Sequence, residues 1–245
     1  MSFSFPPQDI IHIDAGAPLV ILAGSHGGCV EVVASEQIRS TPELKGKTLA
    51  ISEPGSDEHI FMSMFAAYVG LNPQKDINWA VHPHPDQARL LTERKIDALF
   101  CGPPESLELR KRKVGHVLLS TTTDKPWSQY HCCLAASSKE FVRKHPVATK
   151  RALRAILKAN DLCAAEPKRV ARFLADKGLA PYNNSLQMLR ELPYGKWREF
   201  DPEDAMRFYA LRMRELGMIK SSPQKIIADG TDWRFLRELR KELKA

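Results

Sequence analysis

The pattern of hydrophobic and polar positions changes character near residue 138 of this 245-residue chain. Before that point, short apolar runs alternate with amphipathic segments, and turn-forming residues separate them. This alternation is typical of strands and helices that follow one another in an α/β sheet. After that point the pattern is almost wholly helical. The chain is therefore predicted to be an α/β protein with a helical carboxyl-terminal part.

The stretch from residue 44 to 71 gives the strongest local prediction. Its apolar run predicts a strand over 47–52, and a glycine-containing turn follows. Ser56 is a good N-cap for a helix over 56–69 that ends at Gly70. The apolar face predicted for this helix consists of Phe61, Met64, Phe65 and Tyr68.

A strand–turn–helix unit of this kind leaves backbone N–H groups at the start of its helix. Those groups face the crevice beyond the strand ends, where open α/β sheets bind small ligands. The alternative is that Ser56 and Asp57 cap the helix themselves and that no ligand binds there. Asp57 and Glu58 support the alternative, because they already occupy the positive end of the helix dipole and would repel an anion.

The remaining elements follow from the same patterns. Further strands are predicted over 1–4, 18–24, 30–34, 77–81, 97–101, 116–120 and 131–136. Further helices are predicted over 8–14, 85–95, 105–112, 138–144, 146–165, 167–176, 202–216 and 232–243, with Thr231 as the cap of the last. The wholly apolar strand over 18–24 would be buried on both faces, and the alternation over 30–120 is that of a parallel sheet.

Composition and charge narrow the class of protein. Apolar residues make up 43% of the chain and charged residues 27%, which is typical of soluble globular domains. No apolar run approaches the ~20 residues that span a bilayer. The net charge of +7 lies largely on helices after residue 139, and no nucleic-acid motif accompanies it. The amino terminus lacks the pattern of a secretion signal.

The cysteines and histidines predict neither a disulfide framework nor a metal site. The five cysteines are odd in number and form no CxxC pair or zinc spacing, so they are interpreted as buried free thiols. His82 and His84 flank Pro83 at a strand end. That spacing suits a metal ion, but the sequence offers no third ligand nearby.

Four segments of the chain together resemble a known family. They are ELKGKTLAISEPGSDEH, GLNPQKDINWAVHP, KIDALFCGPPE and SSKEFVRKHPVATKRALRAILKA. In combination they resemble the periplasmic solute-binding proteins of ABC importers for nitrate, sulfonates, taurine and thiamine-precursor pyrimidines, the NMT1-like family. The resemblance extends over almost the whole chain from about residue 9.

The resemblance implies a fold of two α/β lobes with hinge crossings, the type 2 periplasmic-binding-protein-like fold. Residues 1–26 and 131–245 would form lobe 1, and residues 27–130 would form the inserted lobe 2. The crossings would lie near 25–32 and 127–133. Family members begin with a strand–helix–strand–helix unit that has no counterpart here. Lobe 1 is therefore expected to be incomplete, through an upstream start or a shortened paralogue.

The resemblance also implies a ligand in the cleft between the lobes. The ligand-binding residues that it implies are Ser25, His26, Gly55, Ser56, His59, Pro103, Glu105, Trp127 and Gln129. Ser56 and the amides after it would donate to a ligand oxygen. His59 would either face the cleft or cap the helix, and Trp127 would either stack on a flat ligand or cover the hinge.

Acidic side chains near the predicted cleft bear on the charge of the ligand. They are Glu53, Asp57, Glu58 and Glu105. Because carboxylates disfavour an anion, a neutral heterocycle or a ligand with a cationic part fits at least as well as nitrate or a sulfonate.

The function that this resemblance implies is non-catalytic capture of a small organic solute for an ABC permease and its ATPase. The protein would be periplasmic, peripheral to the membrane, and without a cofactor. One alternative is an enzyme like those of thiamine-pyrimidine synthesis, which use a cysteine-rich iron site; His131, Cys132 and Cys133 are the only comparable feature. The other alternative is a degenerate paralogue without ligand function.

Overall fold

The computed structural model describes residues 1–243, and packing divides them into two compact units. Unit 1 comprises residues 1–28 and the chain from residue 125 onward, and unit 2 comprises Cys29–Asp124. No helix within the described residues has both the length and the apolar character to cross a membrane. Each unit has its own sheet.

The sheet of unit 1 has three antiparallel strands in the order β1-β8-β2. They are β1 (Ser2–Ser4), β8 (Leu134–Ser138) and β2 (Leu19–Gly24). Strand β2 is buried from Val20 to its end, as its unbroken apolar run predicted. Strand β8 begins at Leu134, not at residue 131 as predicted. Residues 131–133 precede the strand and bond to the segment that follows β2.

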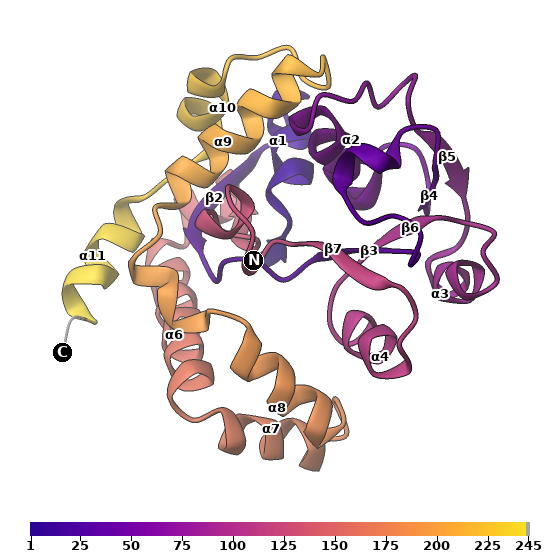
Figure 1. Cartoon of the computed structure of the whole chain (residues 1–245). Coiled ribbons are helices and arrows are strands. Elements are labelled where there is room, and N and C mark those ends of the chain that lie inside the picture. The colour runs from indigo at the N-terminus through magenta and orange to yellow at the C-terminus, as the bar shows by residue number, and fades with distance from the viewer. Residues whose placement is uncertain (244–245) are drawn as a thin grey trace. The chain divides into compact units, whose positions relative to one another are not determined.

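Helices make up the rest of unit 1. They are α1 (Pro6–Asp14), α5 (Lys139–Lys144), α6 (Pro146–Ala165), α7 (Pro167–Asp176), α8 (Tyr182–Glu191), α9 (Pro202–Glu215), α10 (Pro223–Gly230) and α11 (Arg234–Glu242). Two short 3-10 helices, η2 (Trp127–Gln129) and η3 (Tyr194–Arg198), complete it. Helices α1, α10 and α11 contact β2, and α9 packs on α1 and α10. Helices α7 and α8 lie side by side near the end of α6 (Figure 1).

Three predictions for the helical part need correction. Helices α8 and α10 were not predicted, because turn-forming Asn183, Asn184 and Ser185 open α8 and Gly230 closes α10. Thr231 does not cap α11, since its hydroxyl donates back to the Ile227 carbonyl at 2.9 Å. The bounds predicted for α6 and α7 are confirmed.

The sheet of unit 2 has five strands in the order β5-β4-β6-β3-β7. They are β3 (Glu31–Ala34), β4 (Thr48–Ile51), β5 (Asn78–Val81), β6 (Ala98–Cys101) and β7 (His116–Ser120). Strand β4 is parallel to β5 and β6, but β3 is antiparallel to β6 and β7. The prediction of a wholly parallel sheet is therefore wrong. Apolar alternation does not encode the direction of β3, which inserts between β6 and β7.

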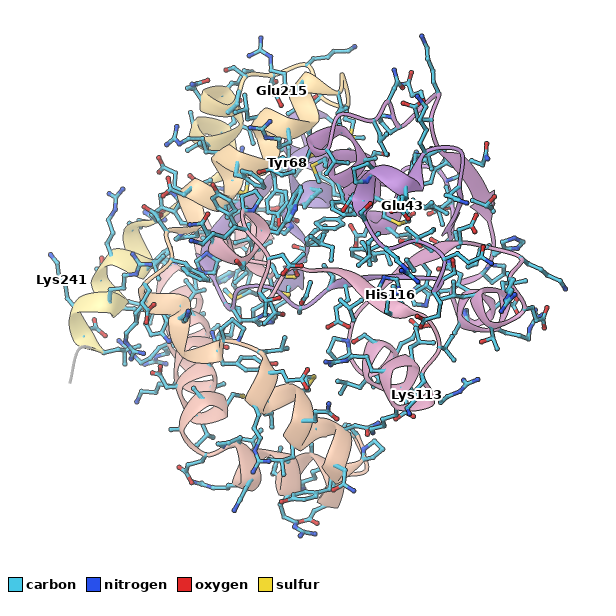
Figure 2. The ribbon with its side chains drawn as sticks, viewed as in Figure 1. Glu43, Tyr68, Lys113, His116, Glu215 and Lys241 are labelled. Atoms are coloured by element: carbon cyan, nitrogen blue, oxygen red, sulfur yellow. The ribbon has the colours of Figure 1, made fainter. Side chains whose placement is uncertain are left out.

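The helices of unit 2 are α2 (Asp57–Tyr68), α3 (His84–Thr92) and α4 (Glu105–Arg112), preceded by the 3-10 helix η1 (Thr41–Leu44). Helices α2 and α3 contact β6, and Leu90 and Leu91 of α3 pack with Leu99 in the core. Helix α2 is buried from Ile60 to Ala66, on more than one face. Tyr68 was predicted on its apolar face but is 50% exposed at the helix end (Figure 2).

Candidate functional site

Ser25 stands directly after strand β2, where the sheet of unit 1 ends, and is held by Asn160 of helix α6. The Ser25 hydroxyl donates to Asn160 Oδ1 at 3.0 Å, and Asn160 Nδ2 donates to the Ser25 carbonyl at 3.2 Å. Both residues are buried. Because each partner satisfies the other, the pair fixes the backbone direction of the segment that leaves β2.

His26 follows Ser25 and is also buried. Its ring lies 4.9 Å from the ring of Tyr194, and its Nδ1 donates to the Gly27 carbonyl at 2.9 Å. Burial opposes the charged form of His26, but its hydrogen bond and charge interaction with Cys133 and its bond to Gly27 outweigh that effect and raise its pKa. The bond to the Gly27 carbonyl occupies Nδ1 and leaves Nε2 for the hydrogen bond with Cys133.

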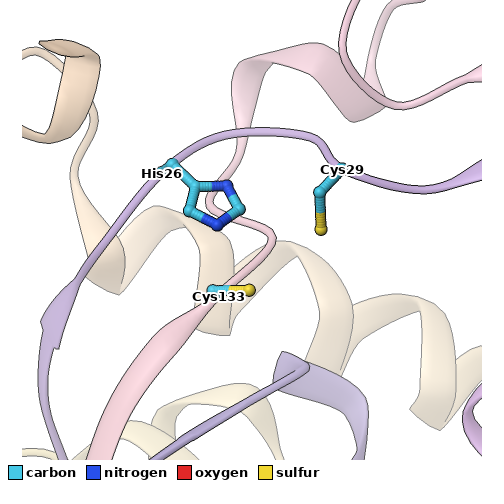
Figure 3. A group of neighbouring side chains, drawn as sticks. All are labelled: His26, Cys29 and Cys133. Atoms are coloured by element: carbon cyan, nitrogen blue, oxygen red, sulfur yellow. The ribbon is translucent and has the colours of Figure 1, made fainter. Parts of the chain in front are cut away.

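Two backbone hydrogen bonds bring Cys133 beside His26. The Ser25 amide donates to the Cys133 carbonyl, and the Cys132 amide donates to the His26 carbonyl, each at 2.9 Å. The side chains of His26 and Cys133 are hydrogen-bonded to each other. Figure 3 shows a His26 ring nitrogen directed toward Cys133.

His131 fills the adjoining position, against the backbone of Gly24. It is fully buried, and neither of its ring nitrogens has a hydrogen-bond partner among the described residues. The ring stands edge-on to Phe200 at 5.6 Å. Burial, together with the charges of Arg240 and His26, lowers the pKa of His131 to about 3. His131 is therefore neutral at physiological pH.

The segment before helix α2 in unit 2 uses its backbone donors internally. His59 Nδ1 accepts from the Gly55 amide at 2.9 Å, and Glu58 Oε1 accepts from the Ser52 amide at 2.9 Å. The Ser56 hydroxyl accepts from the His59 amide at 3.4 Å as the N-cap. Ser56 therefore caps the helix as predicted, and ligand binding at this helix start stays a prediction. Burial lowers the pKa of His59, so its neutral form accepts the Gly55 bond.

Replacing Ser56 with alanine is expected to destabilise the protein by about 1 kcal/mol, because the helix loses its N-cap acceptor. Urea unfolding would measure the change, and Ser56→Asp is the matched variant that retains a capping oxygen. A loss above 2 kcal/mol in Ser56→Ala, or an equal loss in both variants, would contradict the capping role.

Glu105 lies beside a histidine within unit 2. Its Oε2 lies 3.4 Å from His84 Nδ1, and both side chains are partly exposed. Burial raises the pKa of Glu105, while the nearby His84 charge opposes that rise. Pro103, also half-buried, precedes α4 by two residues. Among the described residues, His82, His84 and Glu105 do not bring their ligand atoms close enough together to hold a metal ion.

Trp127 and Gln129 lie together on η2 in unit 1 but in different surroundings. The Trp127 ring is 1% exposed and packs edge-on against Phe208 at 5.3 Å. It is also 6.4 Å from the ring of Tyr209. Gln129 is exposed. Of the two roles considered for Trp127, the packing role is the one that these contacts support.

Sequence reasoning did not include Asn160 or Cys133 among the site residues. The cysteines were interpreted as buried thiols, but Cys133 is half-buried and is hydrogen-bonded to His26. Asn160 lies on a helix whose pattern predicted only packing. A mid-helix asparagine among apolar residues was the available signal, since buried amides require partners.

The cysteine-rich alternative for an enzyme depends on His131, Cys132 and Cys133. The structure buries His131 and Cys132 and leaves Cys133 half-buried. The three residues lie in the segment before β8, not in a strand as predicted. Catalysis by this group stays a prediction.

Solved structures with the periplasmic-binding-protein fold match this chain over nearly its full length. The nitrate-binding protein NrtA from Synechocystis PCC 6803 matches 98% of the chain and 73% of its own length, with a TM-score of 0.79 and 16% identity. The alkanesulfonate-binding protein SsuA from Xanthomonas axonopodis pv. citri, bound to MOPS, matches 94% of the chain and 79% of its own length, with a TM-score of 0.74 and 15% identity. The chain thus has the two-lobe periplasmic-binding-protein fold.

The NMT1-like family model matches residues 26–176, which is more than half of the chain. The chain belongs to the NMT1-like family. The nitrate/nitrite-binding protein NrtA of Nostoc sp. strain PCC 7120 is 22% identical over 57% of the chain and 32% of its own length. The bicarbonate-binding protein CmpA of Synechococcus sp. strain PCC 6301 is 23% identical over 65% of the chain and 35% of its own length. The match spans about a third of these curated relatives.

Proposed function

We propose that this chain is a non-catalytic, solute-binding component of an ABC importer, acting in the periplasm with a permease and its ATPase. The observation that carries the proposal is the match to nitrate-binding NrtA over 98% of the chain. Membership of the NMT1-like family supports it independently of the fold. A curated relative of part of the chain, NrtC of Synechocystis sp. strain PCC 6803, is a nitrate import ATP-binding protein.

The two packing units would act as the two lobes of the binding protein. Their boundaries, after Gly28 and after Asp124, fall near the lobe boundaries that the sequence predicted. Each unit also has its own sheet and core, as a lobe that moves as a body requires. A ligand held between lobes stays a prediction, as do the individual binding residues.

We assign the ligand to the class of small oxyanions and sulfonates. The related proteins are named for nitrate, nitrite, bicarbonate and sulfonates, all of which carry oxygen atoms that accept hydrogen bonds. On this chain, the raised pKa of His26 favours a charged donor at the end of β2. Glu58 and Glu105, which suggested a neutral ligand, are bonded to the Ser52 amide and to His84. The lowered pKa of Glu58 keeps its carboxylate charged, so the repulsion of an anion at that helix start remains.

Calorimetric titration and thermal unfolding of the purified full chain with nitrate, bicarbonate, an alkanesulfonate, taurine and a pyrimidine would test the proposal. One oxyanion or sulfonate is expected to bind saturably and to stabilise the protein by about 2.7 kcal/mol at a concentration of 100 Kd. Binding of the pyrimidine alone would contradict the ligand class. Failure of every ligand to bind would contradict solute capture.

Matched histidine variants would test the predicted contact of His26. His26→Gln is expected to weaken binding of that ligand by about 10- to 100-fold, since a charge-assisted hydrogen bond contributes about 1.5–3 kcal/mol. His12→Gln removes an exposed histidine on α1 and is expected to bind normally. Equal affinities in the two variants would exclude His26 from the site.

A further inference from the structure

A cavity of about 370 Å³ lies within unit 2, at the end of the sheet where β3 finishes and where β6 and β7 begin. Strand β3 is antiparallel to both of these strands, so Ala34 pairs with Ala98 and with His116 at this end. Residues at and after the ends of β3, α3 and α4 line the cavity, and all of them belong to unit 2. The volume falls in the usual range of small-molecule sites, about 300–1,000 Å³.

The cavity is separate from the residues of unit 2 that were predicted to bind the solute. Gly55, Ser56 and His59 follow the carboxyl end of β4, and Pro103 and Glu105 follow the carboxyl end of β6. Because β4 and β6 are parallel, both sets of residues belong to the same end of the sheet. The cavity adjoins the amino end of β6 and therefore lies at the opposite end of the sheet.

We infer that this cavity binds a phosphorylated sugar or polyol. Three of its lining residues are the cations Arg94, Arg112 and Lys113, and none of their side chains has an ion-pair or hydrogen-bond partner among the described residues. A phosphate monoester carries a charge of about −1.5 to −2 at pH 7 and offers three strong acceptor oxygens. Arginine and lysine are the side chains that pair with such a group through charge-assisted hydrogen bonds.

Other lining residues suit the hydroxylated carbon chain of such a ligand. Leu91 and Ile96 give the cavity an apolar wall, and the exposed carboxylate of Glu36 can accept from a hydroxyl group. The second carboxylate of the lining, Asp97, already accepts a hydrogen bond from the Thr48 amide at 2.9 Å. Three cations against these two carboxylates leave the lining with a net positive charge.

Ser35 supplies a hydroxyl that the fold itself does not use. Its amide donates to the Asp97 carbonyl at 2.8 Å, which continues the pairing of β3 with β6. Ser35 lines the cavity, and its Oγ is buried without a hydrogen-bond partner among the described residues. Buried hydroxyl groups normally have a partner, and an oxygen of a ligand in the cavity would supply one.

Arg94 and Lys113 adopt a backbone conformation that glycine usually provides. They follow α3 and α4 with φ angles of +58° and +54°. A Cβ atom is disfavoured in this conformation, so glycine is the common residue after a helix. The Arg94 amide donates to the Leu91 carbonyl at 3.1 Å, and the Lys113 amide donates to the Arg110 carbonyl at 3.2 Å. These bonds satisfy carbonyls at the helix ends, which reduces their repulsion of an anion.

Calorimetric titration of the full chain with glucose 6-phosphate, ribose 5-phosphate and glycerol 3-phosphate would test the cavity. At least one of them is expected to bind saturably, with one site per chain. Glucose and inorganic phosphate are expected to bind at least about tenfold more weakly, because each lacks one part of the recognised group. Saturable binding of none of the three compounds, or equally tight binding of inorganic phosphate, would overturn the proposal.

Matched lysine variants would assign the binding to the cavity. Lys113→Gln is expected to weaken binding of that compound by about tenfold or more, because a charge-assisted contact is lost. Lys75→Gln removes an exposed lysine of unit 2 that does not line the cavity, and it is expected to bind normally. His26→Gln changes unit 1 and is also expected to bind normally, which separates this site from the predicted solute contact. Equal affinities of the two lysine variants, or a loss of binding in His26→Gln, would refute the site.

Two further variants separate ligand binding from a structural role. Lys113→Gly is expected to weaken binding but to raise the midpoint of thermal unfolding by about 2 °C, since glycine adopts the positive φ without crowding. Ser35→Ala is expected to weaken binding by about tenfold and to change that midpoint by no more than about 1 °C, because its hydroxyl has no partner in the fold. Unchanged binding in both variants would overturn the proposal.

Discussion

Gly24→Ala is expected to destabilise the protein by about 2–3 kcal/mol, a typical cost of overpacking a filled core. A Cβ atom at residue 24 would lie 2.3 Å from Cδ2 and Nε2 of His131. The His131 ring is fully buried against Phe200, so it has little room to move away. Urea unfolding monitored by circular dichroism would measure the loss.

Two comparisons separate this clash from the general cost of replacing a glycine. Gly195→Ala is the control, because a Cβ there approaches nothing closer than 3.4 Å. Its stability is expected to change by no more than about 0.5 kcal/mol. In a double-mutant cycle, His131→Ala should remove most of the Gly24→Ala penalty. Additive losses in the double mutant would show that His131 is not the obstacle.

Stability is expected to fall by about 2 kcal/mol between pH 7 and pH 5 through His131 alone. The pKa of His131 is lowered from the ordinary 6.5 to about 3 in the folded protein. As the pH falls below 6.5, the unfolded chain binds a proton that the folded chain does not accept until the pH is near 3. Unfolding therefore becomes easier by about 1.4 kcal/mol per pH unit in that window.

Measuring this effect requires a variant without the buried imidazole. His131→Leu is similar in size and does not titrate, and it also removes two ring nitrogens that have no partner among the described residues. The difference in free energy of unfolding between this variant and the parent, measured at pH 7, 6 and 5 with a chelator present, should grow as the pH falls. A constant difference would show that His131 titrates normally when folded.

The sequence predicted most elements because local signals and burial agreed. Strand β2 is an unbroken apolar run, which is stable only when both of its faces are buried. Helix α6 is an amphipathic segment that begins with a proline, which is stable as a helix with one face against the core. Helices α8 and α10 were missed where turn-forming residues oppose the helix locally and tertiary packing overrides them. The direction of β3 was missed because side-chain periodicity is the same in parallel and antiparallel strands.

In the candidate site, too, some residues were named from the sequence and others were identified only in the structure. Ser25, His26, Gly55, Ser56 and His59 were named through the family resemblance, and their roles in binding stay predictions. The hydrogen bond between Gly55 and His59 was not predicted. Asn160 and Cys133 could not be placed beside Ser25 and His26 from spacing in the chain.

By itself, the sequence determined the α/β class, the positions of most helices and strands, and the resemblance to NMT1-like proteins. These properties depend on residues that are neighbours in the chain or recur with the period of one element. Only the tertiary structure decided that His26 lies beside Cys133, and that Gly24 must lack a side chain beside His131. Contacts of that kind join residues more than one hundred positions apart, and the hydrogen bonds between folded segments set their distances.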